Sequence, residues 1–370
     1  MQERNEMILQ ASKQASKQAS KQASKQASKI IGLDVFRCFA AIIILLFHSA
    51  IHVKCDYGIL QSFIMMGAIF MTGFFLLSGF SLFQGYKDKD FTKSININDF
   101  YKKRLINLLP AYYAIMGIYV LFYGKETVFE NIILLPAELL VIQSWYTSLF
   151  DVTHNGGTWF ISCILPCYLL YPFLQTYLRQ LNTKSIILIV LVCVFILLYS
   201  PFLVKVFHLA GIYPNPFFRV LEFLIGIGLA IMKPTIDFYL PKVFVEKSKV
   251  FVLLEMLLLI LLVTFAYQIG IAKNYMLYSW IALPLFILLI YHLCFLQVHN
   301  RYAIIIINYI SKISYCIFLA QFIVFPVIKS VNISSNLERI LSVCGLCLII
   351  ATVMHYSIEK PMKKYLQNHI

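Results

Sequence analysis

Two ionisable residues inside the first apolar segment, Arg37 and His48, are the first candidates for chemistry. The ten residues between them, Cys38 to Phe47, carry no charge. In a helix, eleven residues make about three turns and roughly 16 Å of rise, so both side chains lie on one face. Ionisable groups inside a membrane span are costly and usually mark a functional path. His48 can act as a general base on a hydroxyl, because imidazole titrates near neutral pH. Its alternative role is a structural hydrogen bond.

Arg37 also has two interpretations. It can extend its guanidinium to the membrane surface, or pair with Asp34 one turn earlier. Alternatively, it faces an anionic ligand that enters from the cytoplasm. The separation of roughly 16 Å is comparable to an extended pantetheine arm. One ligand could then have its phosphates near Arg37 and a thioester near His48.

A second group of cations, Lys102, Lys103 and Arg104, precedes an apolar segment. These charges either set the membrane orientation or form a phosphate cradle for a nucleotide-like donor. Clustered cations offset phosphate charge, and Arg can bind phosphate through two hydrogen bonds.

Two further pairs lie within apolar segments. Arg219 and Glu222, three residues apart, share a helix face and either neutralise each other or contact the substrate. Ser78 and Gly79 favour close helix approach, because small residues let helices pack tightly. Ser78 as an acyl-accepting nucleophile is the lesser alternative, since no adjacent base is evident.

The elements that must position these residues are membrane-spanning helices. The chain of 370 residues is 60% hydrophobic and only 13% charged, with a mean hydropathy of +0.79. A soluble domain of this length does not have that composition. We therefore predict an all-α integral membrane protein with a bundle of about ten transmembrane helices. The predicted spans are residues 31–53, 59–83, 105–123, 159–178, 185–205, 217–232, 250–268, 277–296, 313–328 and 340–357.

The net charge of +14 does not require a nucleic-acid partner. With a cytoplasmic N-terminus, 23 of the 31 Lys and Arg residues lie on the inner side of the predicted spans. Excess Lys and Arg in cytoplasmic segments is the positive-inside rule. It predicts that both termini are cytoplasmic. Six cations lie at or beyond the outer ends of the spans: Lys54, Lys125, Lys205, Lys273, Lys329 and Arg339.

The nine cysteines predict neither a zinc site nor a disulfide framework, and Cys344 and Cys347 in an apolar helix favour packing. The first apolar stretch is too long for a cleavable signal peptide and lacks a small-residue cleavage site. A bacterial inner membrane is the natural location.

The chain is expected to divide into a cytoplasmic low-complexity tail, residues 1–29, and one membrane domain, residues 30–370. Residues 11–29 repeat Ala-Ser-Lys-Gln. Such polar sequence is typical of a solvated tail. A tandem GCAA tract read in triplets encodes this tetrapeptide, so slippage by one unit would switch expression off. We hypothesise phase variation, which is typical of bacterial genes that decorate the cell surface.

Five motifs in order resemble the membrane-bound acyltransferase 3 family, in its single-domain branch. The first is Arg37, ten residues and then His48, and the second is Phe74-Phe-Leu-Leu-Ser-Gly-Phe80. The third joins Thr158-Trp-Phe-Ile161 with Tyr168-Leu-Leu-Tyr-Pro172. The last two are Ile313-Ser-Tyr-Cys-Ile-Phe-Leu-Ala-Gln321 and Ile358-Glu-Lys-Pro361. The resemblance covers about residues 30–365.

The resemblance implies acyl-CoA donation from the cytoplasm and O-acylation of a glycan at the far face. His48 would be the catalytic base, and Arg37 would help hold the donor. Two positions depart from the family pattern. The second cation of a cytoplasmic Arg-x-x-Arg pair is Asn107 here, for which Lys102 or Lys103 would substitute, and a late His is Gln321.

We therefore predict a membrane O-acetyltransferase that moves acetyl from acetyl-CoA to a surface glycan, with lipopolysaccharide or lipooligosaccharide as the favoured acceptor. Acetyl-CoA and membrane lipid are the other expected partners; no metal or permanently bound cofactor is expected, and the oligomeric state stays open. The alternatives are a transporter or flippase that uses Arg37, Arg219 and Glu222 as a charged path, and an inactive regulatory homologue. Further candidates for contact with the substrate are Asp34, Ser78, Trp159, Arg219, Glu222 and Gln321.

Overall fold

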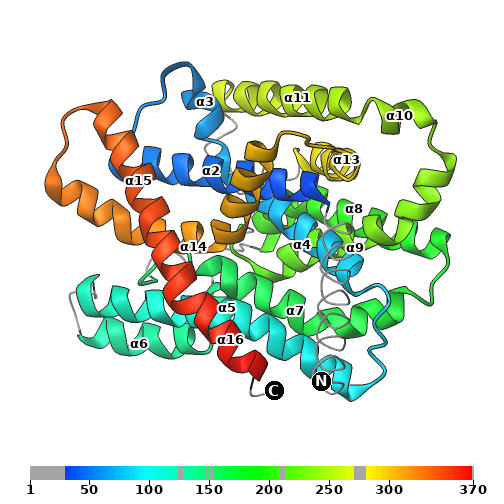
Figure 1. The fold of residues 1–370 in the computed structure, drawn as a ribbon, viewed down its shortest axis with the longest axis horizontal. Helices are drawn as coiled ribbons and strands as arrows, with labels where there is room; N and C mark the ends of the chain where they lie inside the picture. The colour runs from blue at the N-terminus through cyan, green and yellow to red at the C-terminus, as the bar shows by residue number, and fades with distance from the viewer. Residues whose placement is uncertain are drawn as a thin grey trace, which may run out of the picture.

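The protein is an all-α bundle in a computed structural model that describes residues 30–123, 128–146, 149, 153–207, 213–270 and 281–368. The predicted tail, residues 1–29, lies outside the described residues. Figure 1 shows most long helices running roughly side by side. The α-helices of the described residues, long and short, are α2 (Ile31–Val53), α3 (Gln61–Ile64), α4 (Phe70–Tyr86), α5 (Ser94–Tyr123), α6 (Val128–Leu139), α7 (Trp159–Leu178), α8 (Thr183–Phe207), α9 (Pro216–Tyr239), α10 (Lys242–Glu246), α11 (Ser248–Gln268), α13 (Leu283–Leu293), α14 (Arg301–Val331), α15 (Asn336–Met354) and α16 (Lys360–Asn368).

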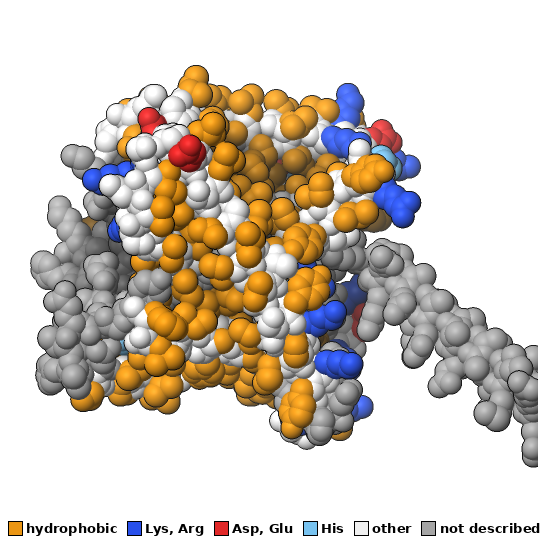
Figure 2. Space-filling model, turned by 60° about the vertical axis from the view of Figure 1, so that its left-hand side comes forward, with side chains coloured by type: hydrophobic (Ala, Val, Ile, Leu, Met, Phe, Trp, Pro, Cys, Tyr) orange, Lys and Arg blue, Asp and Glu red, His pale blue; other side chains and the backbone are white. Residues whose placement is uncertain are grey.

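The predicted spans fall on helices, although span 59–83 is divided between α3 and α4, and residues 277–280 of span 277–296 lie outside the described residues. Eight described helices, against ten predicted spans, are long and apolar enough to cross a membrane. The difference arises at α9 and α13. Helix α9 carries four charged residues along its length, and α13 has only 11 residues. Figure 2 shows a broad band of hydrophobic side chains, with most visible Lys and Arg along one edge. The chain is a multi-pass membrane protein.

Two glycines bring α4 and α9 into close contact. A Cβ on Gly79 would lie 2.0 Å from the carbonyl oxygen of Phe223, and one on Gly226 would lie 2.0 Å from that of Leu76. Only glycine permits this backbone approach from both sides, as in other small-residue helix interfaces in membranes. The packing interpretation of the Ser78-Gly79 motif therefore fits the structure.

Helix α2 is central, because it packs against α4 on one side and α14 on another. Helix α14 packs against both α2 and α15. Helix α14 begins at Asn300, whose side chain accepts hydrogen bonds from the backbone N–H groups of Tyr302 and Ala303. Helix α15 begins in the same way at Ser335. These N-caps satisfy donors that a helix end would otherwise leave unpaired. Helix α14 lies along the face of α2 that carries Arg37 and His48, because Ser311 bonds Asp34 and Phe322 packs against His48.

Candidate functional site

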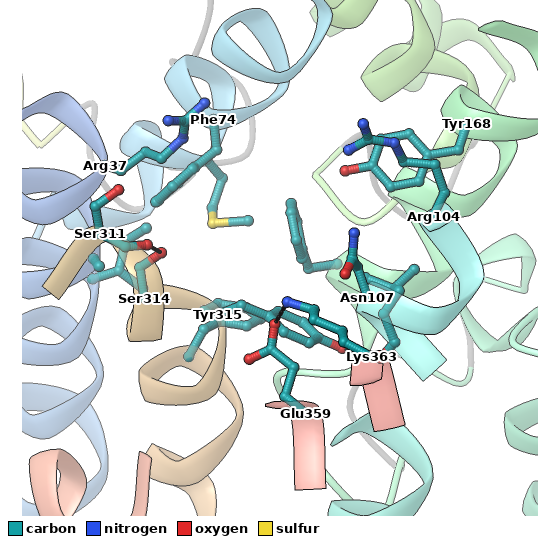
Figure 3. A pocket seen from close by; sticks show the side chains of 16 residues that line it. Arg37, Phe74, Arg104, Asn107, Tyr168, Ser311, Ser314, Tyr315, Glu359 and Lys363 are labelled. Carbon is teal, nitrogen blue, oxygen red and sulfur yellow. Dashed lines mark hydrogen bonds and ion pairs between the residues drawn. The ribbon is translucent and has the colours of Figure 1, made fainter. Parts of the chain in front are cut away.

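A cavity of about 480 Å³ lies between α2, α4, α5, α7, α14 and the end of the chain. Three cations from three different elements line it: Arg37, Arg104 and Lys363. Figure 3 shows Arg37 and Arg104 on opposite sides of the space, with Glu359 and Lys363 on a third side. The remaining lining is polar at some points and aromatic at others: Asn107, Tyr168, Ser311, Ser314, Tyr315, Phe74, Phe160 and Phe318. Such a mixture suits a ligand with an anionic part and an apolar part.

Arg37 is held in place from two sides. Its Nη1 donates to Asp34 Oδ1 at 2.7 Å, and its Nη2 donates to Ser81 Oγ on α4 at 2.8 Å. Asp34 also accepts a 2.6 Å hydrogen bond from Ser311 Oγ on α14. The predicted pairing of Arg37 with Asp34 is therefore present, and it directs Arg37 toward the cavity. About a third of the Arg37 side chain (30%) stays exposed.

Arg104 is the member of the cytoplasmic cation cluster that reaches the cavity. Its Nη2 donates to the Tyr86 hydroxyl at 3.0 Å, and its guanidinium lies 5.1 Å from the Tyr86 ring centre and 5.7 Å from that of Tyr168. Lys102 and Lys103 are exposed on other faces of α5 and do not line the cavity. The site roles predicted for these two lysines stay predictions.

Lys363, which the sequence did not single out, supplies the third cation. Its ammonium pairs with Glu359, whose other oxygen bonds His355 Nδ1 at 2.6 Å. A π-helical turn, His355–Glu359, separates α15 from α16, and such turns are frequent at functional sites. Cys316, His355 and Glu359 have potential metal-ligating atoms within 4.8 Å of one another. Because the Lys363 ammonium already pairs with the Glu359 carboxylate, we interpret Cys316, His355 and Glu359 as a hydrogen-bonded cluster beside the cavity and not as a metal site.

His48 lies one helical turn beyond the cavity. Arg37, Ala41 and Ile44 line the cavity from α2, and the same spacing of three to four residues continues to His48. Its Nδ1 is buried and has no hydrogen-bond partner within the described residues. The side chain of Gln321 is close enough to interact with the imidazole. Gln321 itself is fully buried and donates to the Phe318 carbonyl at 3.0 Å.

The far side of His48 is covered by Phe322 of α14. The two ring centres are 5.0 Å apart, and Phe322 also lies 5.5 Å from the ring of His52. The Phe322 ring is so close to Gly156 and Gly157 that a Cβ on either glycine would approach it within 2.9 and 2.8 Å. Gly156 and Gly157, which precede α7, therefore pack against the ring that covers His48.

A buried pair fixes the chain just before Gly156. His154 Nδ1 lies 2.6 Å from Glu138 Oε2, and the His154 backbone N–H donates to Glu138 Oε1 at 2.8 Å. Both side chains are almost completely buried. Burial of such a pair is stabilising only when hydrogen bonds satisfy it, as they do here.

Arg219 and Glu222 lie together but outside the cavity. Arg219 Nη1 is 2.7 Å from Glu222 Oε2, and Thr72 donates to Glu222 at 2.8 Å. The Arg219 guanidinium lies among aromatic rings, 4.8 Å from the Tyr213 ring centre and 5.5 Å from that of Trp159. The predicted mutual neutralisation is present. Ser78 does not line the cavity either.

The fold and site together define a multi-pass membrane protein with a cation-lined cavity and, one helical turn beyond it, a half-buried histidine. Comparison with known protein families is more specific: residues 30–356 match the acyltransferase 3 family, described as "Acyltransferase domain". The chain therefore belongs to the acyltransferase 3 family and is an acyltransferase. Comparisons with curated proteins and with solved structures find no match.

Proposed function

We propose that this acyltransferase moves an acetyl group from acetyl-CoA to a hydroxyl of a cell-surface glycan. The observation that carries the proposal is the line of residues along α2. Arg37 faces a cationic cavity, Ala41 and Ile44 continue its wall, and His48 follows one turn later with an Nδ1 that has no hydrogen-bond partner in the described part of the chain. A donor with anionic and acyl ends matches that order.

The chemistry of the cavity suits a coenzyme A donor. Arg37, Arg104 and Lys363 bring three cationic groups to the cavity, and Ser311 and Ser314 add hydroxyl groups. Arg37 and Lys363 are each paired with a carboxylate, Asp34 and Glu359, so a phosphate would share these two cations with their carboxylates. Phosphates bind best where charged donors are fixed before the ligand arrives. Arg37 is fixed in this way by Asp34. The volume of about 480 Å³ is within the usual range of ligand sites.

His48 would act as the general base at the end of this path. A neutral imidazole has one nitrogen that accepts a proton, and the unpartnered Nδ1 is available for that role. His48 takes the proton of the acceptor hydroxyl, whose oxygen forms an ester bond with the acetyl carbon. The thioester C–S bond breaks, and the proton held by His48 restores the CoA thiol.

The direction of transfer follows from the predicted orientation. Lys and Arg predict that the Arg37 end of α2 faces the cytoplasm, where acetyl-CoA is made available, and that the His48 end faces outward. The acceptor would then be a glycan on its way to the bacterial surface, with lipopolysaccharide or lipooligosaccharide as the favoured class. The Ala-Ser-Lys-Gln repeat supports phase-variable expression of a surface antigen.

The transporter alternative is less well supported. It requires Arg219 and Glu222 to form a charged path with Arg37. The pair is instead enclosed by Thr72 and aromatic rings and does not line the cavity that contains Arg37.

Mass spectrometry of the surface glycan tests the proposal. Cells with the wild-type gene should carry an acetyl increment that is absent after deletion of the gene and absent with His48→Ala. His299→Ala is the matched control, because the His299 side chain is exposed and lies just before α14, outside the part of α2 that carries His48. Equal amounts of each variant in the membrane must be verified. Retained acetylation with His48→Ala contradicts the assignment of the base.

A further inference from the structure

A second cavity opens at the opposite end of α2 from Arg37, beyond His48. This outer pocket, of about 280 Å³, is lined by residues from the end of α2, the end of α14 and the start of α15: His52, Val53, Lys54, Ile328, Lys329, Asn332, Ile333 and Arg339. Three of its eight lining residues are Lys or Arg, and none is a carboxylate.

The concentration of cations here is unusual for this chain. Only six Lys and Arg residues are expected at the outer ends of the spans, and three of them, Lys54, Lys329 and Arg339, converge on this one pocket. The positive-inside rule disfavours cations on this side. Orientation in the membrane therefore does not explain them.

The hydrogen bonds of Arg339 explain why this cation lies at the pocket. It donates to the carbonyls of Val53 and Lys54 at 3.2 and 3.0 Å and to that of Ile333 at 3.1 Å. These bonds neutralise the carbonyl end of α2, which would otherwise repel an anion.

Lys54 and Lys329 are different. Both are exposed, and within the described residues neither forms an ion pair. Among the nearby carboxylates, Asp56 accepts a hydrogen bond from the Gly58 N–H, and Glu338 lies in the first turn of α15 and is not part of the pocket lining.

Two helices end at this pocket with left-handed C-caps. Lys54 (φ 56°) ends α2 and Asn332 (φ 49°) ends α14, and the backbone N–H of each bonds a carbonyl of its own helix, which is a common way for helices to end. The two helix ends thus present their side chains in a fixed arrangement around the pocket.

The outer pocket lies next to the His48 site. His52 lines the pocket, and its ring centre is 6.0 Å from that of His48. Lys54 follows His48 by six residues, about 9 Å along α2. A molecule anchored at Lys54 and Lys329 can therefore extend a neighbouring hydroxyl toward His48 once Phe322 moves aside.

We propose that the outer pocket binds an anionic group, a phosphate or a carboxylate, of the acceptor. This inference rests on the proposed function, because it assumes that a glycan acceptor approaches His48 from this side. The acceptor class then narrows to acidic glycans, in which a charged substituent lies on the acylated sugar or close to it. Lys54 and Lys329 bind the charge, and the sugar extends inward.

Calorimetric titration of the full-length protein in phosphatidylcholine nanodiscs tests this directly, with glucose 6-phosphate as the probe and glucose as the neutral comparison. Glucose 6-phosphate should bind more tightly than glucose, and added salt should weaken it. The double variant Lys54→Asn with Lys329→Gln should lose about tenfold or more in affinity. Asn tolerates the positive φ at position 54, so the variant adds no backbone strain. Lys312→Gln, which removes one exposed charge from the first half of α14, outside the pocket, is the control and should bind normally.

Equal affinity for the two sugars, or unchanged affinity in the double variant, overturns the inference. Loss of sugar phosphate binding in phosphatidylglycerol nanodiscs assigns the pocket to a lipid headgroup and also overturns it. The His48→Ala variant separates this inference from the proposed function: it should bind glucose 6-phosphate normally while it fails to acetylate. Acetylation by His48→Ala contradicts the base assignment, and the titration still decides whether the anion site exists.

Discussion

Replacing Lys363 by Gln should weaken binding of acetyl-CoA without unfolding the protein. A hydrogen bond from a charged donor to a charged group contributes about 1.5–3 kcal/mol. Because 32% of the Lys363 side chain is exposed, solvent screens its charge, and the lower end of that range applies. A loss of about 1.5 kcal/mol corresponds to an approximately tenfold higher Kd. Glu359 keeps its 2.6 Å hydrogen bond to His355, so the cavity wall retains a partner.

The assay is calorimetric titration of acetyl-CoA into the purified protein, together with the KM for acetyl-CoA in a transfer assay. Both constants should rise about tenfold while kcat changes much less, because Lys363 binds the donor and does not touch the reacting atoms. Two matched controls are Lys364→Gln, an exposed neighbour, and Lys103→Gln, an exposed member of the predicted cluster. Both should leave Kd within about twofold, well below that tenfold effect. An effect of Lys103→Gln equal to that of Lys363→Gln would refute the reasoning.

Two predictions concern the fold. Gly226→Ala should destabilise the protein by about 1–3 kcal/mol, because its Cβ would approach the Leu76 carbonyl oxygen within 2.0 Å. Gly345→Ala, which meets no atom within 4 Å, is the control in thermal unfolding, and equal unfolding temperatures would contradict the close-packing argument. Arg219→Leu alone should cost about 3–5 kcal/mol, because it leaves a buried carboxylate unpaired. The double variant with Glu222→Leu should recover much of that loss in denaturant unfolding; additive losses would show that the two residues do not act as a pair.

The helices were predictable because long apolar stretches and the distribution of Lys and Arg are local properties of the sequence. The same holds for the Arg37–His48 face, since residues spaced by three to four along one helix share a side regardless of their neighbours. Helix α5 extends beyond the predicted span 105–123 at its N-terminal end. Helix α5 begins at Ser94, because its first turns are polar and lie beyond the apolar stretch.

The partners of these residues were not predictable. Ser81 reaches Arg37 across 44 residues of sequence, and Lys363 faces Arg104 only because α16 packs against α5. Nothing local distinguishes Lys363 from the other basic residues near the C-terminus. The structure instead leaves Lys103 outside the cavity, since side chains one or two positions apart on a helix point to different faces.

The outer pocket and the contact of Phe322 with His48 were also not predictable, because each joins residues that are far apart in the sequence. Lys54 and Lys329 are 275 residues apart and meet because α2 and α14 end side by side. The Gly156-Gly157 motif suggests a turn in any sequence. Only the packed structure shows that the Phe322 ring lies against it.

The central claim is acyl transfer from acetyl-CoA through His48, and an isotope experiment tests it most directly. The purified protein is reconstituted in lipid vesicles with carbon-13-labelled acetyl-CoA and deacetylated surface glycan, and the glycan is analysed by mass spectrometry. We predict a labelled acetyl ester with the wild-type protein and none with His48→Ala, at equal protein amounts and equal acetyl-CoA binding. Labelled ester formed by His48→Ala, or wild-type protein that transfers no label, would contradict the account.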